Sequence, residues 1–282
     1  MTTTDEWEAG ILAKLRRAFD LRDELKEQQV HLRADRGTTR DYESRSNASD
    51  AACPLLHMEW RLAAAPSPLP LSFAALLGDV IQNLRAALDY AAWAGATQEA
   101  RAKHSRLVSF PLLQKESDFQ RWRDTRGDWF DSEVVRVIEA SQPYHAPTHQ
   151  LHPLRVLQVL SNHDKHRLLN VVEDAHVSHG ITITPMPADY TWWAATGPVA
   201  LGEPLATLSL PRSKESQVID VAPSFGWYES VAFNSGERDV EWLRIDELLN
   251  SICPFVVETV GLMSGARLGL KPQATDRDEG SQ

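Results

Sequence analysis

Apolar and polar residues repeat along this chain with two different periods, and the longer one predicts helices. Apolar side chains recur every three or four residues over 5–33, 76–91, 153–168 and 240–266, the spacing that places them on one face of an α-helix. Pro153 suits the first turn of the third segment, where its missing N–H would have had no partner. We therefore expect four long amphipathic helices and a shorter one at 132–140.

The shorter period is strict alternation, which predicts β-strands. Residues 56–62 alternate apolar with polar side chains, as in a strand with one buried face. Short runs rich in β-branched and aromatic residues follow between 169 and 234, separated by Pro, Gly, Asp and Ser. They predict an antiparallel sheet of about five or six strands. Residues 34–52 read as a polar loop, and 97–150 as mostly irregular chain with a short extended piece at 108–113.

Together these segments predict an α+β protein in which helices bracket a β region. We expect 1–170 to be mainly helical, with one N-terminal β-strand and the two helices that carry the polar motifs described below. An antiparallel region is expected at 171–236, and at 237–268 a C-terminal helix that packs on the bundle. Residues 269–282 are polar and are expected to be disordered.

The helix over 77–90 has an unusual polar face. Gln82, Arg85 and Asp89 stack along one stripe, and Arg85 and Asp89 are four residues apart, a pairing worth about 0.2–0.5 kcal/mol when exposed. Asn and Gln replace the Lys and Glu mixture typical of a solvated face. The composition therefore favours a polar site over a plain wet surface.

The helix that begins at Pro153 carries a carboxylate on its apolar stripe, Asp164. An ionised carboxylate buried alone costs several kcal/mol, so Asp164 needs a partner, and Arg85 is the expected one. Asn162, Lys165 and His166 line up on the other side. A structural Arg–Asp tie with an ordinary interfacial histidine and a ligand or catalytic site both fit this pattern.

The charge balance limits the partners. The 282 residues include 39 Asp and Glu against 29 Lys and Arg, a net charge of −10, which disfavours non-specific attraction to nucleic acid or anionic membranes. Locally the balance reverses over 101–126, where Lys and Arg outnumber Asp and Glu and Trp122 and Trp129 lie nearby. This run either meets RNA or another phosphate-bearing partner, or is a solvated connection.

Several classes of function lack support. The two cysteines, Cys53 and Cys253, form neither a metal-binding spacing nor a disulfide framework. The histidines between 145 and 179 follow no metal-ligand pattern, so no metal is expected. Glycine-rich nucleotide loops are absent, and no cofactor is expected. Without a signal-peptide pattern or a long apolar run, we expect a cytoplasmic protein with no membrane partner.

Five short motifs occur in order along the chain: Gly78–Asp89 as Gly-Asp-x-x-x-Asn-Leu-Arg-x-Ala-Leu-Asp, Phe110-Pro111-Leu112, Gln142-Pro143-Tyr144, His152-Pro153-Leu154, and Asn162–Arg167 as Asn-x-Asp-Lys-His-Arg. In this set and order the chain resembles a widespread, mostly uncharacterised family of bacterial proteins, over nearly its whole length. The resemblance implies a bacterial protein whose polar site lies between the first and last motifs.

A more distant similarity is to HEPN helical domains, whose ribonuclease members carry an arginine followed a few residues later by a histidine. In this chain Arg85 is followed by Tyr90 at that place. The similarity implies a HEPN-like bundle, a homodimer, and metal-independent RNA or phosphodiester chemistry. In that chemistry Arg85 stabilises phosphate charge, Lys165 or Asn162 orients phosphate oxygens, and His166 transfers protons.

The alternative is a non-catalytic interaction or ligand-binding protein in which the same motifs lock the helices together. A structural polar network of this kind draws on side chains from both motif helices. Its expected members, beside Arg85 and His166, are Asp79, Asn83, Asp89, Asn162, Asp164 and Arg167.

Overall fold

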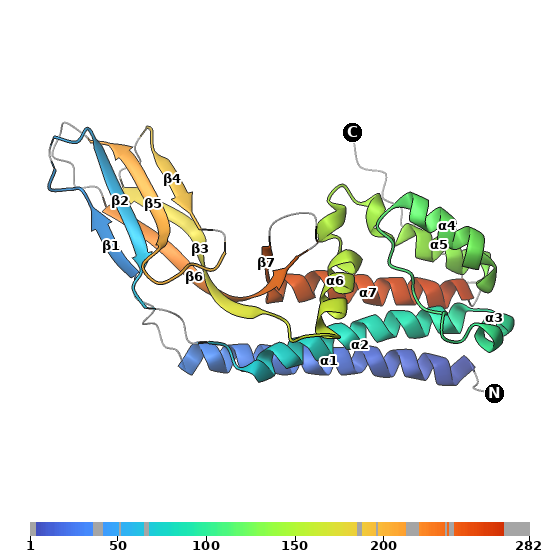
Figure 1. Cartoon of the computed structure of the whole chain (residues 1–282). Helices are drawn as coiled ribbons and strands as arrows, with labels where there is room; N and C mark the ends of the chain where they lie inside the picture. The colour runs from blue at the N-terminus through green and yellow to red at the C-terminus, as the bar shows by residue number, and fades with distance from the viewer. Residues whose placement is uncertain are drawn as a thin grey trace, which may run out of the picture. The chain divides into compact units, whose positions relative to one another are not determined.

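The computed structural model describes residues 4–35, 42–50, 52–64, 68–184, 188–195, 197–212, 220–234, 236 and 240–267. Within them the chain is an α+β protein with antiparallel sheets, as expected (Figure 1). It divides into two compact units. One comprises Met1–Leu25, Ala75–Leu168 and Leu248–Gln282, and the other Lys26–Ala74 and Leu169–Glu247.

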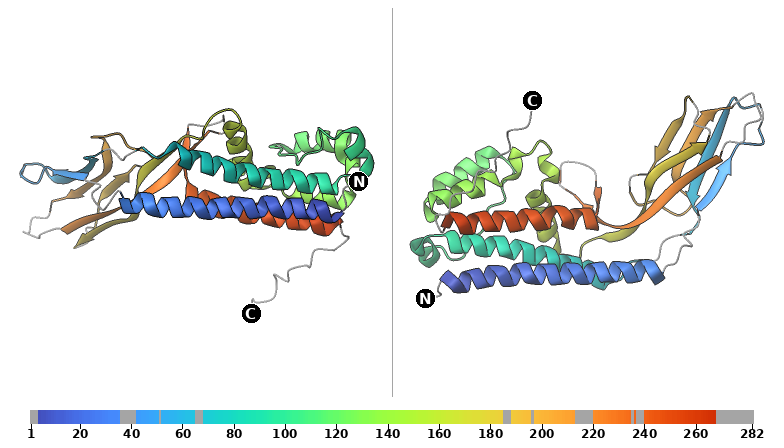
Figure 2. Two further views of the ribbon diagram at one scale, coloured as in Figure 1. Left: turned by 90° about the horizontal axis from the view of Figure 1, so that it is seen from below. Right: turned by 180° about the vertical axis from the view of Figure 1, so that it is seen from behind.

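Three long helices, α1, α2 and α7, lie alongside one another in the first unit, and the shorter α6 crosses them (Figure 2). The helices expected over 5–33 and 76–91 are therefore present, whereas the C-terminal helix begins at Ile245 and not at residue 240, because residues 241–244 pair with β6 (Asp220–Phe233) as a strand. The helices are α1 (Thr4–Asp35), α2 (Leu71–Gly95), α3 (Gln98–Lys103), α4 (Glu116–Arg126), α5 (Ser132–Ala140), α6 (Pro153–Asp164) and α7 (Ile245–Arg267), with single 3-10 turns at Gly127–Trp129, Pro143–His145 and His149–Leu151.

The apolar stripe of α2 is the centre of this unit. Leu77, Ile81, Leu84 and Leu88 are fully buried, as their helical spacing predicts. Each such side chain contributes about 1.5–3 kcal/mol when it is removed from water. Because one face of α2 is fixed in the core, its polar stripe is held in a defined direction.

The other motif helix, α6, begins at Pro153 as predicted. His152 is its N-cap: the imidazole Nδ1 accepts the Leu154 N–H at 3.3 Å. The helix ends at Asp164, so the expectation that it continues to residue 168 is wrong. Lys165 is the C-cap, and His166 lies in the following turn, where helical spacing no longer fixes the direction of its side chain.

The segment between the motif helices is more regular than its sequence suggests. Residues 97–150 contain α3 and α4 as well as the predicted α5. Phe119 and Trp122 anchor α4 in the core, although the helix is otherwise strongly polar, and this polarity hid its short apolar stripe. The expected extended piece at 108–113 belongs to no sheet, and side chains hold its backbone instead.

The second unit contains two antiparallel sheets rather than the single one expected at 171–236. One has the order β1-β2-β5-β4 and the other β3-β6-β7. The strands are β1 (Tyr42–Ser46), β2 (Leu55–Leu62), β3 (Val171–Thr184), β4 (Thr191–Ala194), β5 (Pro204–Pro211), β6 (Asp220–Phe233) and β7 (Glu241–Arg244).

Two expectations about these strands are wrong. A second N-terminal strand, β1, lies in the stretch assigned to a polar loop, and β2 pairs with β5 in the register Trp60↔Ala206. The N-terminal strand therefore completes a sheet with strands from late in the chain instead of accompanying the helices. Its core contains Trp60, Leu208 and, from the other sheet, Ile183.

A buried carboxylate in this unit is neutralised locally. Glu229 on β6 accepts a hydrogen bond from Gln29 Nε2 at 3.0 Å and forms an ion pair with Arg33. The hydrogen bond to Glu229 raises the pKa of the Arg33 guanidinium. Both partners belong to the last turns of α1, so the ion pair fixes the end of that helix against β6 within the second unit.

One helix segment among the described residues, Ile245–Ala266 in α7, is long and apolar enough to cross a membrane by length and composition. Core helices meet the same criterion, and 44% of this segment's apolar window is buried inside the protein. The tail expected to be disordered, 269–282, lies outside the described residues.

Candidate functional site

A cavity of about 270 Å³ opens between the two motif helices and the segment 109–113, with α4 on its far side. Arg85 of α2 and the polar residues Gln158, Ser161 and Asn162 of α6 face it. Its lining residues are Arg85, Ser109, Phe110, Pro111, Leu112, Leu113, Trp122, Arg126, Gln158, Ser161, Asn162 and Lys165.

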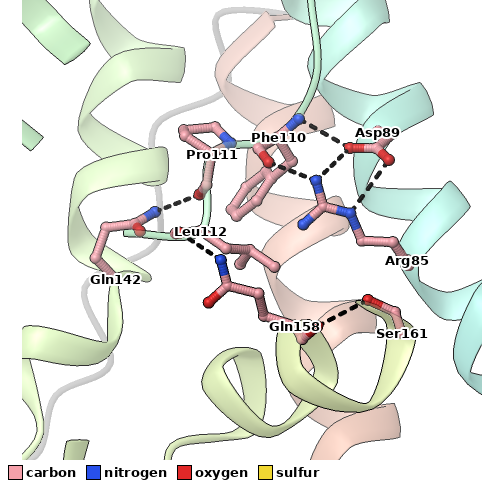
Figure 3. A network of polar contacts seen from close by, with 8 residues as sticks. All are labelled: Arg85, Asp89, Phe110, Pro111, Leu112, Gln142, Gln158 and Ser161. Atoms are coloured by element: carbon pink, nitrogen blue, oxygen red, sulfur yellow. Dashed lines mark hydrogen bonds and ion pairs between the residues drawn. The ribbon is translucent and has the colours of Figure 1, made fainter. Parts of the chain in front are cut away.

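Arg85 and Asp89 together hold one end of the segment 109–113 (Figure 3). The Arg85 guanidinium binds Asp89 through both Nε and Nη2, at 3.2 and 2.9 Å, which confirms the expected pairing. Nη2 also donates to the Phe110 carbonyl at 2.8 Å, and the Phe110 N–H donates to Asp89 Oδ1 at 3.0 Å. Both backbone groups of Phe110 are thus satisfied by one ion pair.

Two glutamines hold the rest of the segment. The Gln142 amide donates to the Pro111 carbonyl and accepts the Leu113 N–H, at 3.0 and 2.9 Å. Gln158 on α6 donates to the Leu112 carbonyl at 3.0 Å. Gln142 is 1% exposed, so each of its bonds replaces water that the site excludes.

Three of the sequence motifs therefore act as one scaffold: α2 and the Gln-Pro-Tyr motif clamp the backbone of the Phe-Pro-Leu motif (Figure 3). Sequence reasoning missed Gln158, although a glutamine three residues before Ser161 on an apolar helix was a usable signal. Its target is a backbone carbonyl, which leaves no pattern in the sequence.

Arg85 is only partly used by this scaffold. Its Nη1 makes no hydrogen bond with any described residue, and in Figure 3 it points away from Asp89, toward Leu112 and Gln158. The side chain is 16% exposed and lines the cavity. One edge of the guanidinium is therefore structural, and the other is available to a ligand.

Much of the positive charge in the cavity has no ion-pair partner among the described residues. Arg126 and Lys165 form no ion pair with the described part of the chain, and Arg126 instead lies over the Trp129 ring at 5.4 Å. Arg85 shares its charge with Asp89, and no carboxylate is among the lining residues. On a chain of net charge −10, this concavity attracts anions locally.

The expected tie between Arg85 and Asp164 is wrong. Asp164 Oδ2 instead accepts a hydrogen bond from Gln82 Nε2 at 3.1 Å, and the same nitrogen donates to the Ser161 carbonyl at 2.8 Å. Gly78 makes room for this contact, because a Cβ at its position would lie 2.1 Å from Asp164 Oδ1. The first and last motifs are thus joined by close packing at a glycine and not by an ion pair.

The remaining predicted residues lie elsewhere. Asn83 accepts a long hydrogen bond from Lys14 Nζ at 3.4 Å and donates to the carbonyl of Asp79, whose side chain is exposed. His166 and Arg167 are exposed after the end of α6. Of the predicted site residues, the cavity therefore brings together Arg85, Asn162 and Lys165, with Asp89 behind them.

Tyr90, where the sequence resemblance led us to look for a histidine, faces α1. Its ring lies over Gly10, where an added Cβ would be 3.2 Å from Tyr90 Cδ2. Tyr90 is not among the residues that line the cavity. In this chain, position 90 therefore contributes to helix packing.

Comparisons of the chain with protein-family models, curated proteins and solved structures find no match. Among the described residues, no three His, Cys, Asp or Glu side chains gather in an arrangement that could hold a metal ion.

Proposed function

We propose that the cavity between α2, α6 and the segment 109–113 binds a phosphate group of a nucleotide or RNA ligand. The observation that carries the proposal is the set of Arg126, Lys165 and the free edge of Arg85 around one cavity without a carboxylate. Arginine offers planar paired donors to phosphate and lysine a compact charge, so the two together suit a phosphate dianion or diester. Asn162 adds an amide donor at the rim.

Binding without cleavage is the form of this proposal that the lining supports. Cleavage of a phosphodiester by Arg85, Lys165 and His166 requires a group that accepts and returns a proton within hydrogen-bond reach of the ligand. The lining contains neither imidazole nor carboxylate, and His166 is not part of it. We also propose, from the sequence resemblance, that the helical bundle is HEPN-like and that the protein forms a homodimer.

Calorimetric titration with adenosine 5′-monophosphate tests the proposal. Lys165→Gln and Arg126→Gln each remove one charge at nearly constant size, and we expect each to weaken binding by about tenfold or more, because a hydrogen bond to a charged group contributes about 1.5–3 kcal/mol. Arg136→Gln is the matched control, since Arg136 is exposed on α5 and pairs with Glu133 away from the cavity.

Equal affinities in the parent and in both cavity variants, or no binding at all, would contradict the proposal. Incubation of the parent protein with labelled RNA in EDTA separates binding from catalysis. We expect bound, intact RNA. Cleavage that disappears in Arg85→Ala and His166→Ala at unchanged melting temperature would instead establish a metal-independent ribonuclease.

A further inference from the structure

A second cavity, of about 620 Å³, follows α4 and adjoins the first. The two share Leu112, Leu113, Trp122 and Arg126, so they are parts of one continuous depression around the held segment. The residues that line the second cavity alone are Gln114, Lys115, Asp118, Arg121 and Thr125.

The cationic residues of the second cavity are spread along a whole helix. At a rise of about 1.5 Å per residue, the 11 residues of α4 span about 16 Å. Lys115 is the N-cap of α4, Arg126 is its last residue, and both line the cavity. Positive charge therefore lies at both ends of α4, and Arg121 and Trp122 line the cavity between them.

The charges of the second cavity are mostly uncompensated as well. Lys115 is exposed and forms no ion pair with the described residues. Arg121 approaches Asp118, the one carboxylate in the lining, at 3.8 Å, and both groups are exposed enough for solvent to weaken the pair. The second cavity therefore continues the positive surface of the first.

We infer that the two cavities together take a single strand of nucleic acid, with one phosphate at Arg85, Arg126 and Lys165 and the following phosphates along Arg121 and Lys115. This inference rests on the proposed function of the first cavity. A single phosphate or a free nucleotide is too short to reach both ends of α4. Leu112, Leu113 and Trp122, the apolar residues that both cavities share, can contact the sugars and bases of a strand. Inorganic polyphosphate has neither sugars nor bases.

The ionic strength dependence of binding measures how many phosphates the protein contacts. Each phosphate neutralised on a single strand contributes about −0.7 to the slope of log affinity against log salt concentration. Loss of Lys115 or Arg121 should therefore make the slope for a long strand shallower by about 0.7 for each variant. The slope for a mononucleotide should not change, because that ligand does not reach Lys115 or Arg121.

The experiment measures fluorescence anisotropy of labelled oligouridylates of increasing length, from one nucleotide to about sixteen, a range that covers the site sizes of known single-strand binders. The proteins are the parent, Lys115→Gln, Arg121→Gln, Lys165→Gln and the control Arg136→Gln. Lys115 and Arg121 are exposed surface residues, so their substitution should leave the melting temperature unchanged. We expect Lys165→Gln to weaken binding at every length, and Lys115→Gln and Arg121→Gln to weaken only the longer strands.

The outcomes separate the two proposals. If Lys165→Gln weakens binding at every length while Lys115→Gln and Arg121→Gln have no effect, the strand inference fails and the phosphate site stands. If no oligonucleotide binds the parent, the proposed function fails with it. Equal competition by inorganic polyphosphate of matched charge, or equal losses in Arg136→Gln, would also overturn the strand inference, because either result would mean that charge alone governs binding.

Discussion

Substitution of Gly78 by alanine tests how the two motif helices are joined. Glycine inside a helix normally costs about 0.5–1 kcal/mol relative to alanine, so Gly78→Ala would be stabilising if the site were open. The added Cβ, however, would lie 2.1 Å from Oδ1 and 2.7 Å from Cγ of Asp164. The carboxylate must therefore move and lose the hydrogen bond from Gln82.

The size of the effect follows from these two opposing terms. A hydrogen bond to a charged group contributes about 1.5–3 kcal/mol, which exceeds the gain in helix propensity. We therefore expect Gly78→Ala to lower the free energy of unfolding by about 1–2 kcal/mol. When Asp164 is already alanine, the clash is absent, and the same substitution should be neutral or stabilising by up to about 1 kcal/mol.

A double-mutant cycle of Gly78→Ala and Asp164→Ala tests this expectation. Urea unfolding of the parent, the two single variants and the double variant is followed by the circular dichroism of the helices. The expected coupling free energy between positions 78 and 164 is about 2 kcal/mol. A Gly78→Ala variant that gains the same stability in both backgrounds would refute the reasoning, because it would mean that Asp164 does not occupy the space beside Gly78.

Two further predictions concern other motif residues. Burial lowers the pKa of His152 from 6.5, with a smaller contribution from His145, so the unfolded chain binds the extra proton first and stability should fall as the pH drops below 6.5. The free energy of unfolding, measured at pH 7.5 and 5.5, should depend less on pH in His152→Asn, which keeps a side chain that can cap α6. An unchanged pH dependence would mean that His152 is not held neutral in the folded protein. The Tyr144 hydroxyl is buried without a hydrogen-bond partner among the described residues, and burial, followed by Glu139 and Glu116, raises the pKa of Tyr144 to about 12. Tyr144→Phe should therefore leave thermal stability unchanged or raise it by up to about 1 kcal/mol, whereas a clear loss would reveal a hydrogen bond through bound water.

Contacts within one helix could be predicted, and contacts between helices could not. The Arg85–Asp89 pair follows from a four-residue spacing, which any α-helix converts into proximity. The partner of Asp164 depends on how α6 is rotated and where it ends. Gln82 donates a hydrogen bond to that carboxylate and Gly78 leaves room for it, whereas charge complementarity alone suggested Arg85.

The same limit explains what was missed at the cavity. Its lining combines α2, α4 and α6 with a segment whose backbone is held by Gln142 and Gln158. Every residue has a backbone carbonyl, so a side chain that binds one does not require any particular residue type at that position. The basic run at 101–126 was visible, but only folding brings Arg126 beside Lys165.

Local signals in the chain were enough to predict the α+β composition, the start of α6, the buried stripe of α2 and the Arg85–Asp89 pair, because hydrophobic period, proline geometry and short spacing act over a few residues. Packing of the whole chain was needed to pair β2 with β5, to place Asp164 against Gly78, and to bring Arg85, Arg126 and Lys165 around one cavity. Those contacts join residues that are distant in sequence, and they form only when the whole core packs.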